Sequence, residues 1–341
     1  MSGGSEVVRR HLLFALAALV VVVLVLETTG PFLNAQFTAM AYFAIAAGGL
    51  TVLTGLNGQL SLGHGALMAV GAYTTALLLR SPDTSLPLPV ILLLAVVVTL
   101  VVGAVVGVAA ARLHGPYLAG ATLALAVAVP GIPLFFSESL GGEQGLTVRM
   151  PEIPGWLADA AYFVTGQDLT QIRYLAYLSW IAVLLVFVLL ANLSRSRVGR
   201  NWQAVRDDDV AAELAGIDLG RARVQAFVVS AGCAGLAGAL MALSARLAAP
   251  SGFALTLSLL LVSAVVLGGL GSLAGALVGA AMLTFLPPLV SEAGTDLGLA
   301  DVQAAQLAPL IYGLVTVLIV LLAPAGVAGG LRKLIHRRRS S

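Results

Sequence analysis

Long apolar runs follow one another along most of this chain. They cover approximately residues 12–29, 33–54, 60–79, 87–111, 116–136, 174–193, 224–249, 256–290 and 303–325. About 20 apolar residues suffice to cross a hydrocarbon core of about 30 Å as a helix. The run 256–290 is too long for one span, and the glycines at 268–272 can interrupt a helix there. The pattern predicts about ten helical segments in an all-α, polytopic integral membrane protein with about 8–10 transmembrane helices.

The composition supports this interpretation. Hydrophobic residues make up 59% of the chain and charged residues 10%, whereas a soluble domain carries about 25% charged residues. That deficit leaves too little polar surface for a water-soluble globule. The short alternating strands of a membrane β-barrel are absent from the sequence. Because the runs fill most of the chain, we expect residues 1–341 to form one domain.

Arginines in the short loops predict the orientation of the chain. Arg9 and Arg10 place the N-terminus in the cytoplasm. Because each span takes the chain to the other side of the membrane, the loop 194–223 then lies inside and the loop 137–173 outside. The first of these loops has six arginines and the second has two. Ten segments return the basic tail 332–339 to the cytoplasm. The alternative for the first run is a cleaved signal peptide, but no small-x-small cleavage pattern follows it.

The apolar runs lack the groups that drive transport or catalysis. Their interiors hold no Asp or Glu, so a transporter driven by an ion gradient is disfavoured. A phosphate-binding P-loop needs a lysine after its glycines, and the only lysine is Lys333 in the tail. Hydrolase motifs are missing, and Cys233 is the only cysteine. We expect no enzyme, no metal or cofactor and no nucleic-acid partner, so that any ATP must bind another subunit.

The segment 53–73 is rich in glycine and polar residues. Such polar side chains are costly in hydrocarbon unless they face protein or water, and small residues allow close helix packing. The segment predicts a broken helix that lines a solute pathway. Its candidate wall residues are Asn57, Gly58, Gln59, Ser61, Gly63 and His64. The alternative is a tight helix crossing in which these polar side chains satisfy one another.

A second segment, 266–280, follows the same pattern of a glycine break, a serine and small residues at helical spacing. Two such segments in the two halves of a chain indicate an internal structural repeat with a site between the halves. The candidate pathway residues here are Gly268, Gly269, Gly271 and Ser272.

Two loop segments carry further signals. The polar stretch 201–215 suits a short helix that ends at Gly216; it either docks on a partner or is a solvated connector. The stretch 151–163 holds Trp156, Tyr162 and Phe163, and it either lies at the membrane interface or forms an ordinary solvated loop.

Several motifs together resemble the permeases of branched-chain amino acid ABC importers, specifically their LivM-like branch. The resemblance spans roughly residues 33–325. It rests on GLNGQLSLGHGA at 55–66, RLHGPYLAGATLA at 112–124, RVGR at 197–200, AVRDD at 204–208, AAELAGI at 211–217 and VLGGLGS at 266–272.

This resemblance implies a translocation subunit in the inner or plasma membrane. It would pair with a second, LivH-like permease, two cytoplasmic ATPases and an extracytoplasmic solute-binding protein, and lipid would surround it. The loop 194–223 would couple it to an ATPase through Arg200, Trp202, Arg206, Asp207, Ala211, Ala212 and Gly216. Val210 departs from the importers' coupling pattern, which has an acidic residue there.

The resemblance implies transport of branched-chain amino acids or a related solute such as urea or an amide. Pro116, Ala119 and Gly120 replace bulkier or charged residues of the family motif, so the solute can differ. We expect alternating access powered by the ATPases. The alternative is a passive channel for a small neutral solute, whose helices would also lack charge.

Overall fold

The computed structural model describes residues 17–81, 86–113, 115–322 and 326. The predicted cytoplasmic N-terminus and basic tail lie outside the described residues. Helices dominate the described part. An N-terminal helix (Ala17–Thr28) precedes α2 (Pro31–Leu50), the π-helix η1 (Thr51–Leu56), α3 (His64–Leu78), α4 (Leu88–Ala110), α5 (Pro116–Phe135), α6 (Ser137–Leu140), α7 (Gly155–Thr165) and α8 (Gln171–Ser194). Then follow α9 (Arg197–Asp207), α10 (Asp209–Leu214), α11 (Leu219–Ala245), α12 (Leu255–Gly268), α13 (Leu273–Asp296) and α14 (Asp301–Leu322).

The prediction of an all-α membrane protein is confirmed. Eight helices in the described residues are long and apolar enough to span a membrane, and the N-terminal helix and α3 are shorter apolar helices. Each of the ten predicted segments therefore contains a helix. The long run 256–290 divides where its glycines stand, with α12 ending at Gly268 and α13 beginning at Leu273.

Helix α11 forms the centre of the bundle and packs against α4, α3 and α2. Glycines make this contact close. A Cβ atom added to Gly71 of α3 would lie 2.1 Å from the carbonyl oxygen of Gly235 in α11, and one added to Gly238 would lie 1.9 Å from that of Met68. Backbones that meet this closely leave no room for larger residues, which is how small residues bring membrane helices together.

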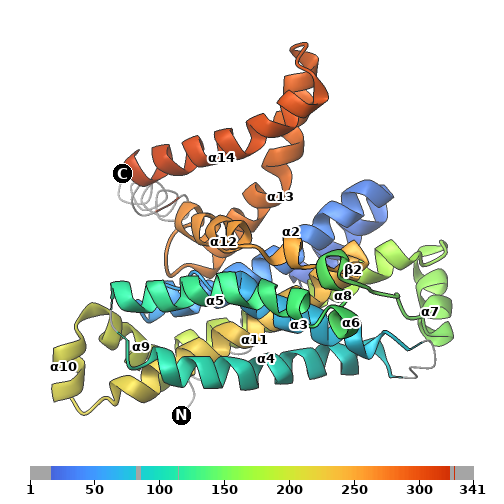
Figure 1. Cartoon of the computed structure of the whole chain (residues 1–341). Coiled ribbons are helices and arrows are strands. Elements are labelled where there is room, and N and C mark those ends of the chain that lie inside the picture. The colour runs from blue at the N-terminus through green and yellow to red at the C-terminus, as the bar shows by residue number, and fades with distance from the viewer. Residues whose placement is uncertain (1–16, 82–85, 114, 323–325, 327–341) are drawn as a thin grey trace, which may run out of the picture.

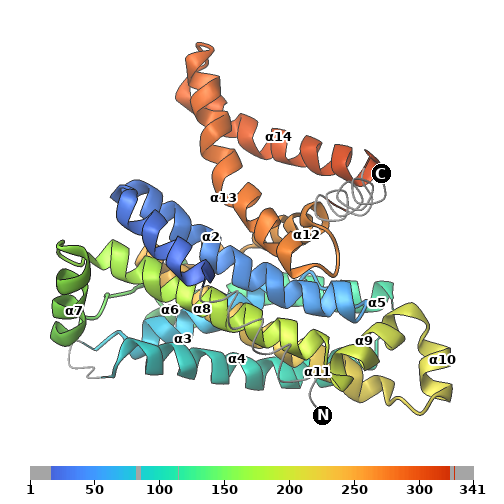
Figure 2. The same cartoon turned by 180° about the vertical axis from the view of Figure 1, so that it is seen from behind.

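The outer faces of α4 and α8 are aliphatic. Val101 and Val105 of α4 and Leu185 and Leu189 of α8 are all exposed, which suits lipid-facing positions in a membrane. The hairpin of α13 and α14 rises above the rest of the bundle (Figures 1 and 2), with α13 packed on α2 and α12.

The two ends of the bundle agree with the predicted alternation of loops between the two sides of the membrane. At one end a two-stranded antiparallel ladder joins β1 (Leu146–Thr147) to β2 (Leu247–Ala248), and α7 lies there (Figure 1). The 3-10 turns η2 (Gly142–Gln144) and η3 (Pro250–Phe253) flank this ladder. Helices α9 and α10 lie at the opposite end (Figure 1). The loops 137–173 and 194–223 thus lie at opposite ends, as predicted.

The prediction of one helix over 201–215 is wrong. Helix α9 begins earlier, at Arg197, and ends at Asp207; Asp208 is extended, with φ −159° and ψ 107°, and α10 follows. The carboxylate of Asp208 accepts a hydrogen bond from the amide of Ala211 at 3.0 Å and so caps α10. Aspartate competes with helix continuation in this way because its side chain bonds nearby amides. The predicted stop at Gly216 is confirmed, with φ 82° there.

Candidate functional site

The first broken helix is built by α2, η1 and the loop before α3. The chain widens from an α-helix into a π-helix over Thr51–Leu56 and then leaves helical geometry. Gly58 has φ 77°, a left-handed conformation that glycine adopts without strain. π-helical turns are rare and concentrate at functional sites. The break falls within the segment that its glycines and polar residues had indicated.

Asn57 and Gln59 are buried in this break and bind each other. The Gln59 side-chain amide donates to Oδ1 of Asn57 at 2.5 Å and to the backbone oxygen of Arg223 in α11 at 3.0 Å. Nδ2 of Asn57 and Oε1 of Gln59 have no hydrogen-bond partner in the described structure. A buried unsatisfied polar atom costs about 1–3 kcal/mol, so a water or a ligand in the cavity that Asn57 and Gln59 line would stabilise these two atoms.

The loop then turns toward α5. Ser61 is buried, and its hydroxyl oxygen accepts from the amide of Gly63 at 3.4 Å. The amide of Leu62 donates to the hydroxyl of Thr122 in α5 at 3.0 Å. A Cβ added at Gly63 would lie 2.9 Å from the carbonyl oxygen of Thr122. Thr122 therefore fixes this loop, although the sequence analysis did not single it out.

His64 is the first residue of α3 and is fully buried. Its imidazole approaches the backbone of Ala46 in α2, but neither ring nitrogen makes a hydrogen bond of good geometry among the described residues. The next amide, that of Gly65, donates to the hydroxyl of Ser258 in α12 at 2.9 Å. The start of α3 is thus held from the second half of the chain, and His64 lies inside that junction.

The second break lies over 268–272, between α12 and α13. Gly269 has φ 116° and Gly271 has φ 79°. The hydroxyl of Ser272 accepts from the amide of Gly275 at 3.2 Å and caps α13. A Cβ added to Gly268 would lie 1.9 Å from the carbonyl oxygen of Gly275, so the two helices meet at their ends without side chains between them.

The two breaks touch each other. A Cβ added to Gly55 would lie 2.2 Å from the backbone nitrogen of Gly271. Both segments therefore form one junction, in which helix–break–helix units from the two halves of the chain pack backbone to backbone. This contact brings together the two glycine segments that the sequence analysis had paired as a predicted internal repeat.

The loop between α8 and α11 reaches the same junction. Nη1 of Arg206, in α9, donates to the carbonyl oxygen of Gly55 at 2.7 Å. The Cγ atom of Arg206 lies 3.0 Å from where a Cβ on Gly58 would stand. Nη2 of Arg206 lies 2.7 Å from Oδ1 of Asp207. Arg206 thus connects α9 directly to the first break and lies beside the second.

A cavity of about 340 Å³ opens beside Arg206, a volume within the range of about 300–1,000 Å³ typical of ligand pockets. It combines charged, amide and aliphatic groups. Its lining is Asn57, Gly58, Gln59, Leu60, Leu113, Gly115, Leu118, Val205, Arg206, Asp207, Asp208, Asp209 and Arg223. It lies at the α9–α10 end of the bundle, against the first break.

The other predicted coupling residues occupy different environments. Trp202 and Ala212 are buried and hold α9 and α10 to the bundle, whereas Arg200 is exposed and donates to the carbonyl oxygen of Arg195 at 3.0 Å. Ala211 is exposed too. The amide of Gly216 donates to the carbonyl oxygen of Glu213 at 2.9 Å, and that of Ile217 to Ala212 at 3.0 Å, the pair of bonds that closes a Schellman motif.

Two apolar side chains on α10 project into solvent. Val210 is 64% exposed and Leu214 is 85% exposed. They stand four residues apart, so they share one face of the helix. Val210 is the residue that departs from the coupling pattern of ABC importers. Exposed apolar groups at the tip of a polar loop form a small surface suited to a protein partner.

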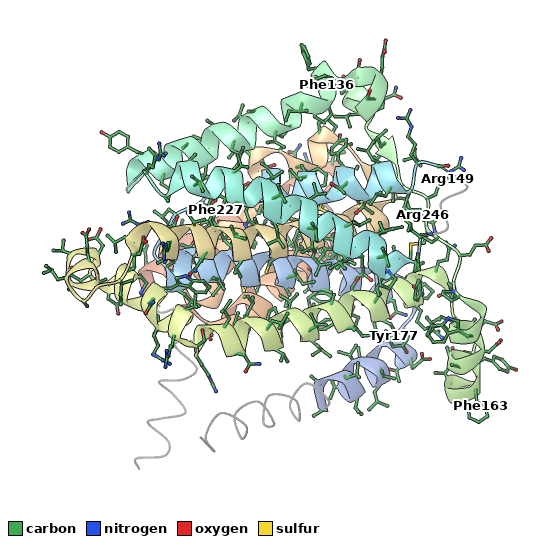
Figure 3. All side chains as sticks on the ribbon, turned by 90° about the horizontal axis from the view of Figure 1, so that it is seen from below. Phe136, Arg149, Phe163, Tyr177, Phe227 and Arg246 are labelled. Atoms are coloured by element: carbon green, nitrogen blue, oxygen red, sulfur yellow. The ribbon has the colours of Figure 1, made fainter. Side chains whose placement is uncertain are left out.

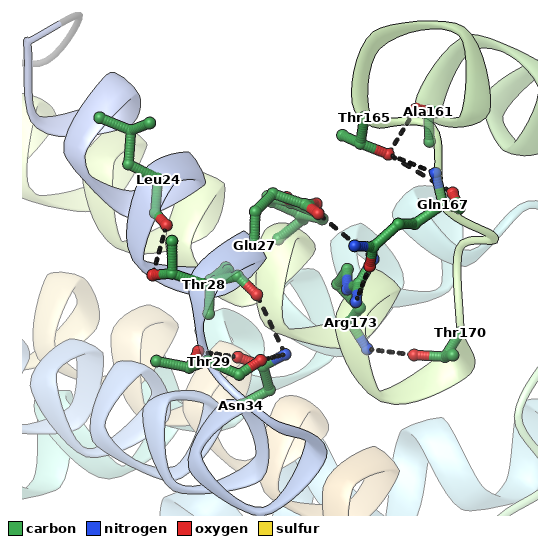
Figure 4. A network of polar contacts seen from close by, with 12 residues as sticks. Leu24, Glu27, Thr28, Thr29, Asn34, Ala161, Thr165, Gln167, Thr170 and Arg173 are labelled. Carbon is green, nitrogen blue, oxygen red and sulfur yellow. Dashed lines mark hydrogen bonds and ion pairs between the residues drawn. The ribbon is translucent and has the colours of Figure 1, made fainter.

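The opposite end holds a polar network around the N-terminal helix (Figure 4). Nη1 of Arg173 lies 3.3 Å from Oε2 of Glu27, and Nη2 donates to Oε1 of Gln167 at 3.0 Å. The hydroxyl of Tyr177 donates to Oε1 of Glu27. Both charged side chains are largely buried. The network fixes the end of the N-terminal helix to α8 and to the loop after α7.

Comparisons with known proteins agree on one family. The family described as branched-chain amino acid transport system permease component matches residues 32–322. The LivM permease of Salmonella typhimurium is 30% identical over 311 residues, which are 85% of this chain and 70% of that protein. BraD of Pseudomonas aeruginosa is 26% identical over 300 residues, covering 86% and 93%, and LivH of Escherichia coli K12 is 25% identical over 299, covering 84% and 91%. No solved structure matches the chain.

Proposed function

Because this chain belongs to the branched-chain amino acid permease family, we propose that it forms the translocation pathway of an ATP-driven importer. As a multi-pass transport subunit it is not an enzyme, and the energy comes from two separate ATPases. A second permease completes the pathway, and an extracytoplasmic binding protein delivers the solute. Residues 1–341 constitute one permease domain in this proposal, placed in the inner or plasma membrane.

The α9–α10 end is the cytoplasmic end in this proposal. Arginine enrichment in the loop 194–223 supports that orientation. The junction of the two breaks then lies near the cytoplasmic ends of α2, α3, α12 and α13. Its polar residues, with Asn57 and Gln59 foremost, form part of the wall that the solute passes. Unpartnered amide atoms at this position support the assignment, because a passing polar solute can supply their missing partners.

The hydrogen bond from Arg206 to the carbonyl oxygen of Gly55 carries the proposal. It joins the loop 194–223, which would bind the ATPase, to the first break, whose conformation would change when the ATPase moves. The exposed pair Val210 and Leu214 would contact the ATPase, while buried Trp202 would transmit the displacement to the bundle. A rigid link from an exposed surface to a helix break is what coupling across a subunit boundary requires.

The proposed solutes are branched-chain amino acids. The relatives named above are branched-chain amino acid transport permeases. The cavity beside Arg206 supports an amino acid over a neutral solute such as urea, since it offers arginines, aspartates and aliphatic residues together. Arg206 pairs there with Asp207, and Arg223 pairs with Asp209. The carboxylate and ammonium groups of an amino acid would therefore exchange into these pairs, while its side chain contacts the leucines of the lining.

Transport in proteoliposomes tests the function. The chain is reconstituted with its partner permease, both ATPases and the binding protein, and uptake of labelled leucine or valine is followed with and without ATP inside the liposomes. We expect uptake only when ATP and the binding protein are both present. Solute flux through the chain reconstituted alone would instead identify a passive channel and overturn the proposal.

A further inference from the structure

A large apolar cavity lies at the α7 end of the bundle, far from the junction of the breaks. Its volume is about 970 Å³. Its described lining comes from the N-terminal helix, the start of α4, α7 with the loops on either side of it, and α8, and it includes Leu19, Pro87, Glu152, Trp156, Ala161 and Ile181. Among the described residues that line the cavity, Glu152 is the only charged one. An apolar ligand of considerable length fits such a space.

The cavity is continuous with lipid-facing surface. Ile181 lines it and is exposed, and Leu185 and Leu189 follow on the same face of α8 at successive helical turns. On the other side, Leu19 and Val23 line the cavity while Val20 and Leu24 beside them are exposed. A lipid chain can therefore enter from the bilayer without crossing a polar barrier.

The rim of the cavity has the features of a membrane–water interface. Trp156 lines the cavity and is largely exposed, and Phe163 on the same helix is 90% exposed (Figure 3). Aromatic side chains gather at the level of lipid headgroups. Tyr177, which lines the cavity, belongs to the polar network of Glu27 and Arg173.

The charge of the rim selects among headgroups. Arg173 is already paired with Glu27, whereas the carboxylate of Glu152 faces no ion-pair partner in the described residues. A lone carboxylate attracts an ammonium group and repels an anionic headgroup. An ethanolamine headgroup meets this requirement, while phosphatidylglycerol carries a net negative charge and no amine.

We propose that this cavity is a binding site for a phosphatidylethanolamine molecule of the surrounding membrane, with one acyl chain between the N-terminal helix and α8 and the amine near Glu152. The lipid fills the space that the N-terminal helix leaves against α7 and α8. It thereby completes the packing of that helix, which the polar network holds at its Glu27 end. This inference requires only that the chain spans a membrane, so it stands apart from the importer function.

Native mass spectrometry of the purified chain tests the site. The protein is exchanged into detergent and titrated with phosphatidylethanolamine or phosphatidylglycerol, and the retained lipid is counted. Ala161→Trp fills the cavity from α7. Val101→Trp adds the same bulk on the exposed face of α4 and is the matched control. Glu152→Gln removes only the carboxylate, and melting curves verify that each variant is folded.

We expect one phosphatidylethanolamine to be retained by the wild type and by Val101→Trp, and to be lost from Ala161→Trp. The wild type should bind phosphatidylethanolamine about threefold more tightly than phosphatidylglycerol, which is the effect of one partly exposed charge pair. Glu152→Gln should lose that preference. Equal retention in Ala161→Trp and Val101→Trp would mean that the lipid is general annular lipid and would overturn the site. Should Ala161→Trp fail to fold, Leu157→Trp repeats the test from the same wall.

Discussion

The guanidinium of Arg206 donates a 2.7 Å hydrogen bond to the carbonyl oxygen of Gly55. The bond joins residues 151 positions apart in the chain, one in a polar loop and the other in a π-helix. Hydrogen bonds of charged donors contribute about 1.5–3 kcal/mol. This contact is short and partly buried, and together with the bond from Gln59 to the backbone oxygen of Arg223 it connects the loop 194–223 to the first break.

Replacing Arg206 should uncouple the loop from the break. Arg206→Ala removes both the bond to Gly55 and the packing on Gly58, so we expect ATP-dependent uptake to fall about tenfold or more, the equivalent of about 1.4 kcal/mol. Arg221→Ala is the matched control, since Arg221 lies in the same loop and pairs with the nearby Asp218 in the described contacts. Uptake and ATPase association are measured together. Normal uptake in Arg206→Ala would refute the coupling role.

The exposed face of α10 should be a contact for the ATPase. Val210→Asp and Leu214→Asp place a charge where an apolar contact is proposed, and we expect each to weaken association by about 2 kcal/mol, as for an interface hot spot. Pull-down or surface plasmon resonance with the purified ATPase measures the loss. Glu213→Gln, between the two on the same helix, should leave binding nearly unchanged. Equal binding by all three variants would place the interface elsewhere.

The crossing of α3 and α11 should not accept a side chain at Gly71. A Cβ there would lie 2.1 Å from a backbone oxygen, and backbone atoms cannot move aside as a flexible side chain does. Gly71→Val should therefore cost more than the 1–3 kcal/mol typical of overpacked cores, which would appear as a lower melting temperature in detergent and poor yield. Gly120→Ala is the control, because nothing lies within 4 Å of a Cβ there. Similar melting temperatures for both variants would contradict the packing described.

The N-terminal helix should be less stably packed when the polar contacts of Glu27 are removed. Glu27→Gln removes the charge that binds Arg173 and Tyr177, leaving the largely buried guanidinium without its carboxylate. Breaking a buried pair on one side costs about 3–5 kcal/mol, and partial exposure reduces that figure here. We expect faster hydrogen exchange over Ala17–Thr28, measured by mass spectrometry, with no change in α11. Unchanged exchange would show that apolar packing alone holds this helix.

Hydropathy and glycine spacing were sufficient to predict most of the fold. Apolar runs of span length can only be helices in a membrane, which is why each predicted segment contains one. The division after Gly268 followed from run length together with glycines that permit φ 116° at Gly269. Apolar runs and glycine positions are local signals, so they can be recognised from a single sequence.

The contacts that build the site were not predictable in the same way. Gln59 bonds a backbone oxygen 164 residues away, and no side-chain pattern encodes a partner of that kind. The interruption at Asp208 was missed because helix propensity over 201–215 is adequate, and the competing cap depends on the geometry of one carboxylate. The side chain of Arg206 points toward Gly55 because the first break lies beside α9. That position is set by the tertiary fold, not by the local sequence.

The contact between Gly55 and Gly271 has a consequence for any motion of this protein. Main-chain atoms meet there with no side chain between them, and main chain does not compress or change rotamer as a packed leucine does. The halves must consequently either travel together or come apart along this seam. In the proposed importer, the pathway beside this junction should therefore switch between two discrete positions rather than open gradually.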